Sequence, residues 1–285
     1  MPALRAFAAE TECALVVTQP DRPAGRGQKL VPTPVKRAAG ALAIPTFEPA
    51  HLRAAVAELA AVNADVFGVA SYGKIVPQAI LDLAPRGALN VHPSLLPLYR
   101  GATPLQSQLR DGATLGGVTI ILMDAGMDTG DIVLRDSCAI GPEETYGELH
   151  DRLARRGAEL LARACEDLRE GRLQRTPQQG LAEPADIART TTRPLTKADL
   201  LVDFSRPARE VVDHVRSLSP APAARGVLPG ETHPVKLLRA HAADAHARGE
   251  LSVRAGDGRY VVIERLVPPN RAAMSGSAYL AASQA

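Results

Sequence analysis

Three residues of this sequence carry the side chains that acyl transfer to an amine requires. Asn90 and His92 stand two residues apart in "NVHPSLLPLYRGATP", and Asp128 lies in "DAGMDTGD". When an amine attacks a carbonyl, negative charge develops on the oxygen and the nitrogen must lose a proton. Asn90 can donate to that oxygen, and His92 can donate when protonated or accept a proton when neutral. Asp128 would orient the imidazole and favour its charged form.

Other catalytic patterns do not accompany these residues. Ser94 has no Gly-x-Ser-x-Gly elbow around it, so we expect no serine nucleophile. The lack of a Gly-x-Gly-x-x-Gly fingerprint weakens a dehydrogenase interpretation. Cys13, Cys138 and Cys165 are odd in number and lie in neither a metal-ligand nor a Cys-x-x-Cys spacing. We therefore expect reduced thiols, no metal site and a cytoplasmic protein.

The elements that must position these residues follow from the apolar pattern. Runs at 65–70, 88–91 and 117–123 are continuous and apolar, which is typical of strands covered on both faces of a parallel sheet. Ligands bind such sheets beyond the carboxyl ends of the strands. Since polar loops follow the second and third runs, we expect both loops to face one crevice. A further strand is predicted at 13–18, and helices at 2–10, 34–42, 51–62, 76–83 and 103–110.

The second half of the chain predicts a change of architecture. "TYGE" at 145–148 has the spacing of a capping box and predicts a long helix that ends near residue 170. Residues 171–195 lose periodicity and are rich in Pro, Gly, Thr and Gln, as linkers are. A helix near 207–218 and short strands with Gly turns then predict a small β-barrel or sandwich. We place a catalytic domain at 1–175, a linker at 176–205 and a second domain at 206–285.

Composition leaves a soluble globular protein of one large or two smaller domains. The 285 residues are 46% hydrophobic, 22% charged and only 3% aromatic, without Trp, which argues against an aromatic platform for single-stranded nucleic acid. No apolar stretch approaches the roughly 20 residues that span a membrane. The net charge of +2 identifies no partner. The segment "QPDRPAGRGQKLVPTPVKR", however, carries five basic residues against one acid, so it is either a solvated loop or a contact for a polyanion.

The motifs around Asn90, His92 and Asp128 resemble the signature of the folate-dependent formyltransferases. "VVTQPDRPAGRGQKLVPTPVK" resembles the members that act on methionyl-tRNA, and the resemblance extends to "RPLTKADLLVDFSRPAREVVDHVRSLSPAP" and "RAAMSGSAYLAA". It implies an α/β fold with a doubly wound, mainly parallel, Rossmann-like sheet and a C-terminal OB-like β-barrel that contacts tRNA. The implied reaction moves a formyl group from 10-formyltetrahydrofolate to methionyl initiator tRNA for translation initiation. We expect a monomer that binds no membrane.

The resemblance also assigns roles to individual residues. The catalytic amide, imidazole and carboxylate of the family fall on Asn90, His92 and Asp128. The basic loop would meet the acceptor end of the tRNA through Arg22, Arg26 and Lys29, while Arg100 is either a substrate contact or part of a structural ion pair. The folate would be held by Ala70, Tyr72, Leu89, Val91, Ser94, Leu95, Leu96, Pro97 and Asp124.

The sequence departs from the family pattern in two places. The family begins with a strand and a Gly-Thr-Pro turn before the helix that starts here at Pro2. A doubly wound sheet normally holds that strand in its middle, so its absence would leave neighbouring strands unpaired. A fragment whose true start lies upstream is favoured over a natural truncation, because the downstream motifs are intact. "SPAP" at 219–222 also lacks an expected Trp, which puts the detailed tRNA contacts of the second domain in question.

Three rival functions remain open at this stage. The first is formyl transfer to a small amine, such as a glycinamide ribonucleotide or an amino sugar; the basic loop and the long C-terminal domain argue against the ribonucleotide. The second is a hydrolase that releases formate from the folate with water as the acceptor. The third is a catalytically disabled remnant that only binds tRNA.

Overall fold

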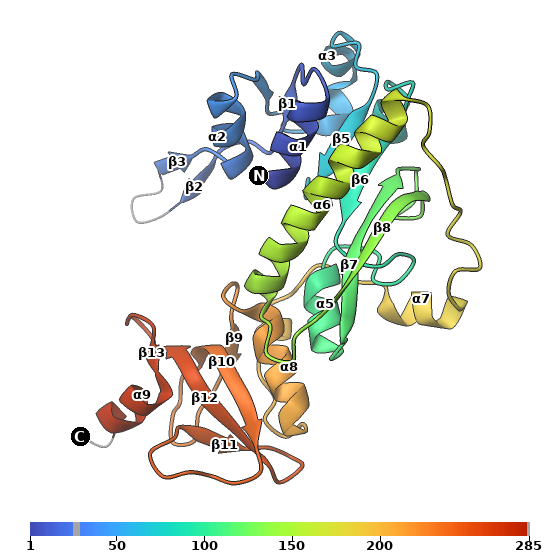
Figure 1. The fold of residues 1–285 in the computed structure, drawn as a ribbon. Coiled ribbons are helices and arrows are strands. Elements are labelled where there is room, and N and C mark those ends of the chain that lie inside the picture. The colour runs from blue at the N-terminus through green and yellow to red at the C-terminus, as the bar shows by residue number, and fades with distance from the viewer. Residues whose placement is uncertain (25–28, 284–285) are drawn as a thin grey trace. The chain divides into compact units, whose positions relative to one another are not determined.

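The computed structural model describes residues 1–24 and 29–283 (Figure 1). Contacts divide the chain into two compact units. The first holds residues 1–101, 117–137 and 152–191, and the second holds 102–116, 138–151 and 192–285. In this described part, no helix combines the length and the apolar character needed to cross a lipid bilayer.

The main sheet of the first unit carries the strand with the candidate catalytic residues. Its order is β5 (Phe67–Ala70), β6 (Ala88–His92), β7 (Leu115–Leu122) and β8 (Asp131–Ala139). β6 pairs in parallel with β5 but antiparallel with β7, so Leu89 lies opposite Leu122 and His92 opposite Thr119. The prediction that β6 and β7 are parallel neighbours is therefore wrong. A strand buried on both faces has the same apolar pattern in either direction, and only the path of the connecting chain decides between them.

A second, two-stranded sheet in this unit pairs β1 (Val16–Val17) in parallel with β4 (Thr46–Phe47). Within the described residues the two sheets are separate, with β1 and β5 not hydrogen-bonded to each other. Side chains from both sheets, including Val17, Phe47 and Phe67, pack on one apolar cluster around Leu52 and Ile80. Side-chain packing thus links the two sheets where backbone pairing does not.

The helices of the first unit, and α5 of the second, agree closely with the sequence patterns. Those predicted at 2–10, 34–42 and 103–110 are confirmed as α1, α2 and α5, within one residue at each end. The run at 51–62 is split into a 3₁₀ turn and a short helix, α3, and the strand predicted at 13–18 is shortened to β1. The helix bounds are Pro2–Glu10 (α1), Pro34–Ala41 (α2), Leu52–Ala54 (3₁₀), Val56–Ala60 (α3), Gln78–Leu81 (α4), Pro104–Arg110 (α5) and Pro184–Thr190 (α7).

Close packing of the long helix α6 (Tyr146–Arg169) against β6 decides which way the strand faces. Leu89 and Val91 pack into an apolar cluster that includes Leu161 of α6. A Cβ at Gly157 would lie 2.6 Å from a Val91 methyl, so the approach leaves room only for glycine. Alternate strand residues point to opposite faces. Asn90 and His92 therefore point away from α6.

In its described residues, the second unit contains a single antiparallel sheet in the region where the sequence predicts a small β-barrel or sandwich of short strands. The strand order is β11 (Ser252–Arg254), β12 (Tyr260–Val267), β10 (Val235–Ala243) and β9 (Ala224–Gly226), and β13 (Met274–Ser275) pairs with β12. Helix α8 (Ala208–Leu218) packs on β10 and β12 and buries Val211, Val215 and Leu218 against Leu237 and Ile263. The unit also contains the 3₁₀ turn Ala198–Leu200 and helix α9 (Gly276–Ser283). The predicted helix and the predicted short strands are thus confirmed, and the strands form one sheet covered by α8.

The predicted capping box is present at the start of α6. The Thr145 backbone N–H donates to Glu148 Oε2 at 2.8 Å, and the Glu148 N–H donates back to the Thr145 hydroxyl at 3.4 Å. These two backbone donors have no partner within the helix, so the reciprocal bonds stabilise its first turn. The bonds that the Thr145 backbone N–H and hydroxyl donate to the Glu148 carboxylate, in that order, lower the pKa of Glu148.

A buried charge network holds α8 to the rest of the second unit. Arg216 Nε donates to Asp213 Oδ1 at 2.6 Å, and Arg209 Nη2 donates to the same oxygen at 2.8 Å. Arg216 also donates to the carbonyls of Gly141 at 3.1 Å and Leu109 at 3.3 Å. The side chains of Asp213 and Arg216 are each only 5% exposed. Two buried charges of this kind are tolerated only while both remain paired.

Asp213→Ala is therefore expected to lower the free energy of unfolding by about 3–5 kcal/mol, because it leaves Arg216 buried and unpaired. Urea denaturation followed by circular dichroism measures the change. The control is Asp244→Ala, which removes the partner of Arg259 at a position 89% exposed and should cost no more than about 1 kcal/mol. Equal losses in the two variants would contradict the role of the buried network.

Candidate active site

His92 is the last residue of β6 and lies almost wholly buried, at 4% exposure. Its Nε2 is 3.0 Å from the Tyr99 carbonyl oxygen, and its Nδ1 is 3.6 Å from Asp128 Oδ2. A carbonyl oxygen only accepts hydrogen bonds, so Nε2 must be the donor. In the neutral ring, Nδ1 is then the unprotonated nitrogen and faces the carboxylate.

Burial decides the charge state of this imidazole. Loss of solvation lowers the pKa of His92, and it outweighs the Asp128 carboxylate and the Tyr99 carbonyl, which raise that pKa; Arg100 lowers it further. The expectation that Asp128 favours the charged ring has the correct sign, but the net shift is downward. His92 is thus neutral near pH 7 and can accept a proton at Nδ1. Because folded His92 resists protonation, it destabilises the fold as the pH falls below the ordinary pKa of histidine.

The turn between β7 and β8 brings Asp128 to His92. Asp128 has a φ of 57°, which is disfavoured for a residue with a side chain. Its Oδ2 accepts a hydrogen bond from the Gly101 N–H at 2.8 Å. A Cβ at Gly130 would lie 2.0 Å from the Leu122 carbonyl oxygen, so the turn can close only with glycine there. The pair therefore forms through a reversal of the chain and not at neighbouring ends of parallel strands.

Asp124, predicted to bind folate, has a visible role inside this turn. Its Oδ1 accepts from the Gly126 N–H at 3.0 Å and from the Thr129 hydroxyl at 2.7 Å. The side chain is exposed, so it remains accessible while it shapes the turn.

Asn90 lies two residues before His92 on the same strand. The alternation of side chains along β6 places both on one face, and Asn90 is half-buried there. The structure thus joins His92 to Asp128 by a contact of 3.6 Å, and strand geometry places Asn90 on the same face as His92. An amide donor and a base on one face of a strand can serve the two ends of an acyl transfer, the oxygen and the attacking nitrogen.

Arg100 is held by Gln178, a residue that no sequence pattern marks. Arg100 donates to Gln178 Oε1 through Nη2 at 2.7 Å and through Nε at 3.2 Å. The sequence allows either a substrate contact or part of a structural ion pair for Arg100. The structure gives it a structural contact, but the partner is the neutral amide of Gln178 and not a carboxylate. Tyr99 and Gly101 were also not predicted as site residues, although the positive φ of Tyr99, 59°, marks a constrained turn.

The loop after His92 uses several predicted folate residues for its own structure. The Ser94 hydroxyl donates to the Leu98 carbonyl at 2.7 Å, and the Thr119 hydroxyl donates to the Ser94 carbonyl at 2.7 Å and accepts from the Leu96 N–H at 3.1 Å. The residues predicted to hold the folate differ in their exposure. Four are buried, namely Leu89, Ser94, Leu96 and Pro97. Tyr72, Val91 and Leu95 are half-buried, and Ala70 is exposed.

The basic loop contains a β-hairpin in the first unit. β2 (Arg22–Ala24) pairs antiparallel with β3 (Lys29–Val31), with Arg22 opposite Val31. Arg22 is exposed, and Arg26 lies outside the described residues. Lys36, counted among the basic residues of this segment, is not available to a polyanion in the same way. Its ammonium group lies 2.9 Å from Asp21 and 2.8 Å from Glu48, and these partners, Glu48 first, raise the pKa of Lys36.

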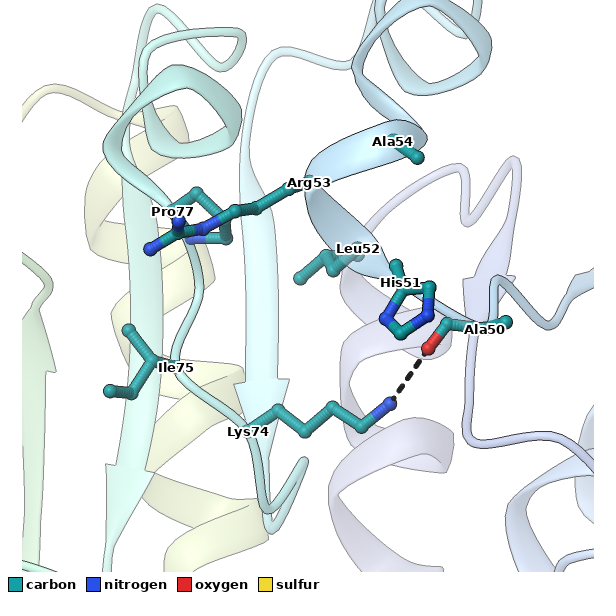
Figure 2. Close-up of a pocket in the computed structure, with 8 residues that line it drawn as sticks. All are labelled: Ala50, His51, Leu52, Arg53, Ala54, Lys74, Ile75 and Pro77. Atoms are coloured by element: carbon teal, nitrogen blue, oxygen red, sulfur yellow. Dashed lines mark hydrogen bonds between the residues drawn. The ribbon is translucent and has the colours of Figure 1, made fainter.

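A cavity of about 580 Å³ opens beside the segments that follow β4 and β5 (Figure 2). Lys74 reaches across it and donates to the Ala50 carbonyl at 3.2 Å. Two further basic side chains, those of His51 and Arg53, contribute to the lining. Neither His92 nor Asp128 lines this cavity, which suits an anionic or partly apolar group and not the chemical step itself.

Family models match most of the chain. The model described as "Formyl transferase" matches residues 2–165, and the one described as "Formyl transferase, C-terminal domain" matches residues 194–284. The chain therefore belongs to the formyl transferase family. This agrees with an α/β unit that carries an amide, an imidazole and a carboxylate, and with a second unit built on an antiparallel sheet.

Among its relatives are proteins named methionyl-tRNA formyltransferase. The one from Syntrophus aciditrophicus is 41% identical over 280 residues, which are 94% of this chain and 87% of that protein. The one from Pelobacter propionicus is 42% identical over 275 residues, or 92% and 84% of the two chains. A similar fold occurs in an N-formyltransferase from Helicobacter canadensis in complex with folinic acid and dTDP-3-aminofucose, with a TM-score of 0.60, 16% identity and 86% coverage of each chain.

Asp128→Asn is expected to lower the pKa of His92 further, because it removes the charge that opposes the effect of burial. Titration of the histidine ring protons by NMR measures this pKa. The exposed ring of His150, whose neighbouring carboxylate Asp151 is left in place by the substitution, serves as the internal control. A rise in the pKa of His92, or no change, would show that Asp128 does not stabilise its protonated form.

Proposed function

We propose that this chain transfers the formyl group of 10-formyltetrahydrofolate to the amino group of methionyl initiator tRNA, for translation initiation. The observation that carries the proposal is the neutral, buried His92, held between the Tyr99 carbonyl and the Asp128 carboxylate on the strand that also bears Asn90. Identities of 41% and 42% to methionyl-tRNA formyltransferases, each over more than nine-tenths of this chain, support the choice of acceptor.

Each of the three residues has a defined task in this reaction. Neutral His92 accepts the proton that the amine loses, at Nδ1, and the facing Asp128 carboxylate stabilises the imidazolium that results. Asn90 donates to the oxygen on which negative charge develops. The Tyr99 carbonyl keeps the ring in one orientation throughout, because the Nε2 proton remains bound to it. The formyl carbon forms its new bond to the amino nitrogen, its bond to the folate nitrogen breaks, and the proton held at His92 Nδ1 passes to that departing nitrogen.

The folate supplies the formyl group, and the basic cavity of the first unit fits its acidic end. Folates terminate in glutamate carboxylates, and the cavity carries Lys74, Arg53 and His51. One side of the cavity, at residues 74, 75 and 77, comes just after Ala70 and Tyr72 in the sequence. The resemblance locates part of the folate site at these two residues. The Tyr72 hydroxyl is buried without a hydrogen-bond partner within the described residues, so the site has an unused polar group. Ser94–Pro97 would then contribute by shaping the loop.

The acceptor tRNA would be engaged by the β2–β3 hairpin. Arg22 and Lys29 belong to its two strands, and Arg26, the third basic residue of the proposal, lies outside the described residues. The Lys36–Asp21–Glu48 cluster lies at the ends of the hairpin and fixes them. Contacts of this kind bind phosphates without reading sequence. Arg100 would contact the tRNA only while it remains hydrogen-bonded to Gln178.

The finer architecture is part of the same proposal. We infer a doubly wound, mainly parallel, Rossmann-like sheet in the catalytic domain, supported by the parallel pairs β1–β4 and β5–β6. An OB-like barrel that contacts tRNA is supported by the antiparallel order β11-β12-β10-β9. We retain the division into 1–175, 176–205 and 206–285, a monomeric state and a cytoplasmic location, the last in keeping with three free cysteines.

The rival functions are separated by the acceptor. Wild-type protein is incubated with 10-formyltetrahydrofolate and, in turn, charged initiator tRNA, an amino-sugar nucleotide, glycinamide ribonucleotide or buffer alone. Formyl transfer to the tRNA is the expected result. Transfer to a small amine without transfer to tRNA would overturn the choice of acceptor, and rapid formate release in buffer would favour the hydrolase. Tight tRNA binding with background transfer would indicate the disabled remnant.

His92→Ala is expected to lower kcat for formyl transfer by about 10²- to 10⁴-fold, and Asn90→Ala by about 10²- to 10³-fold, because the base and the oxyanion donor act in the transition state. Single-turnover assays measure these losses, and filter binding should show that tRNA affinity is retained. His150→Ala, at an exposed position, should stay within about twofold of wild type. Near-normal kcat in His92→Ala would remove His92 from the mechanism.

Arg22→Ala and Lys29→Ala are each expected to weaken tRNA binding and to reduce the slope of log K against log salt by about one, through loss of a phosphate contact. Filter binding over a range of salt concentrations measures both effects. Arg163→Ala, an exposed position on α6, should leave the slope unchanged. An unchanged slope in both hairpin variants would show that the hairpin is a solvated loop.

A further inference from the structure

Gln178 is a buried amide whose hydrogen-bonding capacity is fully used. Its side chain comes from the non-periodic segment after α6, and the residue is 4% exposed. Nε2 donates to the carbonyl oxygens of Asp128 and Gly130, each at 2.8 Å. Oε1 accepts from Arg100 Nη2 at 2.7 Å and Nε at 3.2 Å. Two donors and two acceptor sites are all that a glutamine amide offers.

These four bonds join the two segments that hold the His92 ring. The turn at 99–101 supplies the carbonyl on Nε2 and carries Arg100, while the turn at 124–130 supplies the carboxylate facing Nδ1. A direct bond, from the Gly101 N–H to Asp128 Oδ2, also connects them. Gln178 connects the same two segments a second time, by bonding to the Arg100 side chain of one and to the backbone carbonyls of Asp128 and Gly130 in the other.

Both segments have a backbone that needs such support. Tyr99 and Asp128 have φ values of 59° and 57°, in the left-handed region that residues with a Cβ avoid. Conformations of this kind persist only where the surroundings hold them. The same downstream segment holds the first turn a second time, since the Thr190 hydroxyl oxygen accepts from the Tyr99 N–H at 3.2 Å.

We propose that Gln178 is a positioning residue for formyl transfer: by tying Arg100 to the carbonyls of Asp128 and Gly130, it sets the placement of the Tyr99 carbonyl and the Asp128 carboxylate around His92. The inference rests on the proposed function only in that formyl transfer is the reaction measured. Gln178 touches neither the imidazole nor the carboxylate, so it acts through the residues it holds.

Two variants test the role in the full chain. Gln178→Ala removes all four bonds, whereas Gln178→Glu keeps an acceptor for Arg100 and loses the donor to Asp128 and Gly130. Both are expected to lower kcat by about 10- to 100-fold, as small displacements of catalytic groups do, while KM for the folate changes by less than about threefold. The matched control is Gln174→Ala, an exposed glutamine four residues earlier that bonds only weakly to the Arg172 carbonyl at 3.4 Å.

A double-mutant cycle with Asp128→Asn separates positioning from general loss of structure. If Gln178 acts through Asp128, Gln178→Ala should cost several-fold less in the Asp128→Asn background than in wild type. Equal losses in both backgrounds, or a kcat within about twofold of wild type in both single variants, overturn the inference. So does unfolding of both single variants at the assay temperature, since Gln178 would then be purely structural.

The measurement uses whichever amine the wild-type chain formylates. If that amine is not methionyl-tRNA, the proposed acceptor is wrong, yet the ratios between variants still decide the role of Gln178. If wild type transfers formyl to tRNA and the cycle shows no coupling, only the positioning role fails.

Discussion

The site depends on the burial of one imidazole between a carbonyl and a carboxylate. His92 has exchanged water for the Tyr99 oxygen at 3.0 Å and the Asp128 oxygen at 3.6 Å. Loss of solvation is the larger effect on its pKa, so the ring is neutral but stands where a proton, once accepted, is stabilised. The properties of this imidazole depend on the Tyr99 carbonyl and the Asp128 carboxylate being held in fixed positions around it. The rest of the first unit can be understood as the means of fixing them.

Three layers of structure supply that rigidity. The packing of α6 on β6, so close that Gly157 has no room for a side chain, decides which face of the strand carries Asn90 and His92. The β7–β8 turn then returns Asp128 to the end of β6, which requires Gly130 at its narrowest point. Ser94 and Thr119 finally close the loop that carries Tyr99. Each layer uses buried hydrogen bonds or steric contact, and none relies on exposed ion pairs.

Sequence patterns predicted the helices and strands better than the pairing of the strands and the tertiary contacts between side chains. The strand with Asn90 and His92, helices α1, α2, α5 and α8 and the capping box at Thr145 were foreseen because each leaves a local signature of period or spacing. The antiparallel pairing of β6 and β7 was not, since apolar runs carry no direction. Lys36 was counted among the basic residues of its segment without its partners, because ion pairs with Asp21 and Glu48 depend on tertiary contact. Gln178 went unnoticed for the same reason: a segment without periodicity can still be tightly bonded.

Gln178 and Thr190, which bond to the turns around His92, lie far downstream of them in the sequence. This separation determines the order in which these residues leave the ribosome. His92, Tyr99 and Asp128 lie within a span of 37 residues, whereas Gln178 bonds to Asp128 across a separation of 50 residues, and Thr190 bonds to Tyr99 across 91. Because chains emerge from the N-terminus onward, His92 and Asp128 are synthesised well before Gln178 and Thr190, which bond to the turns around them. A nascent or prematurely terminated chain ending before residue 178 would contain His92, Tyr99 and Asp128 but lack the hydrogen bonds that Gln178 and Thr190 make to the turns around them.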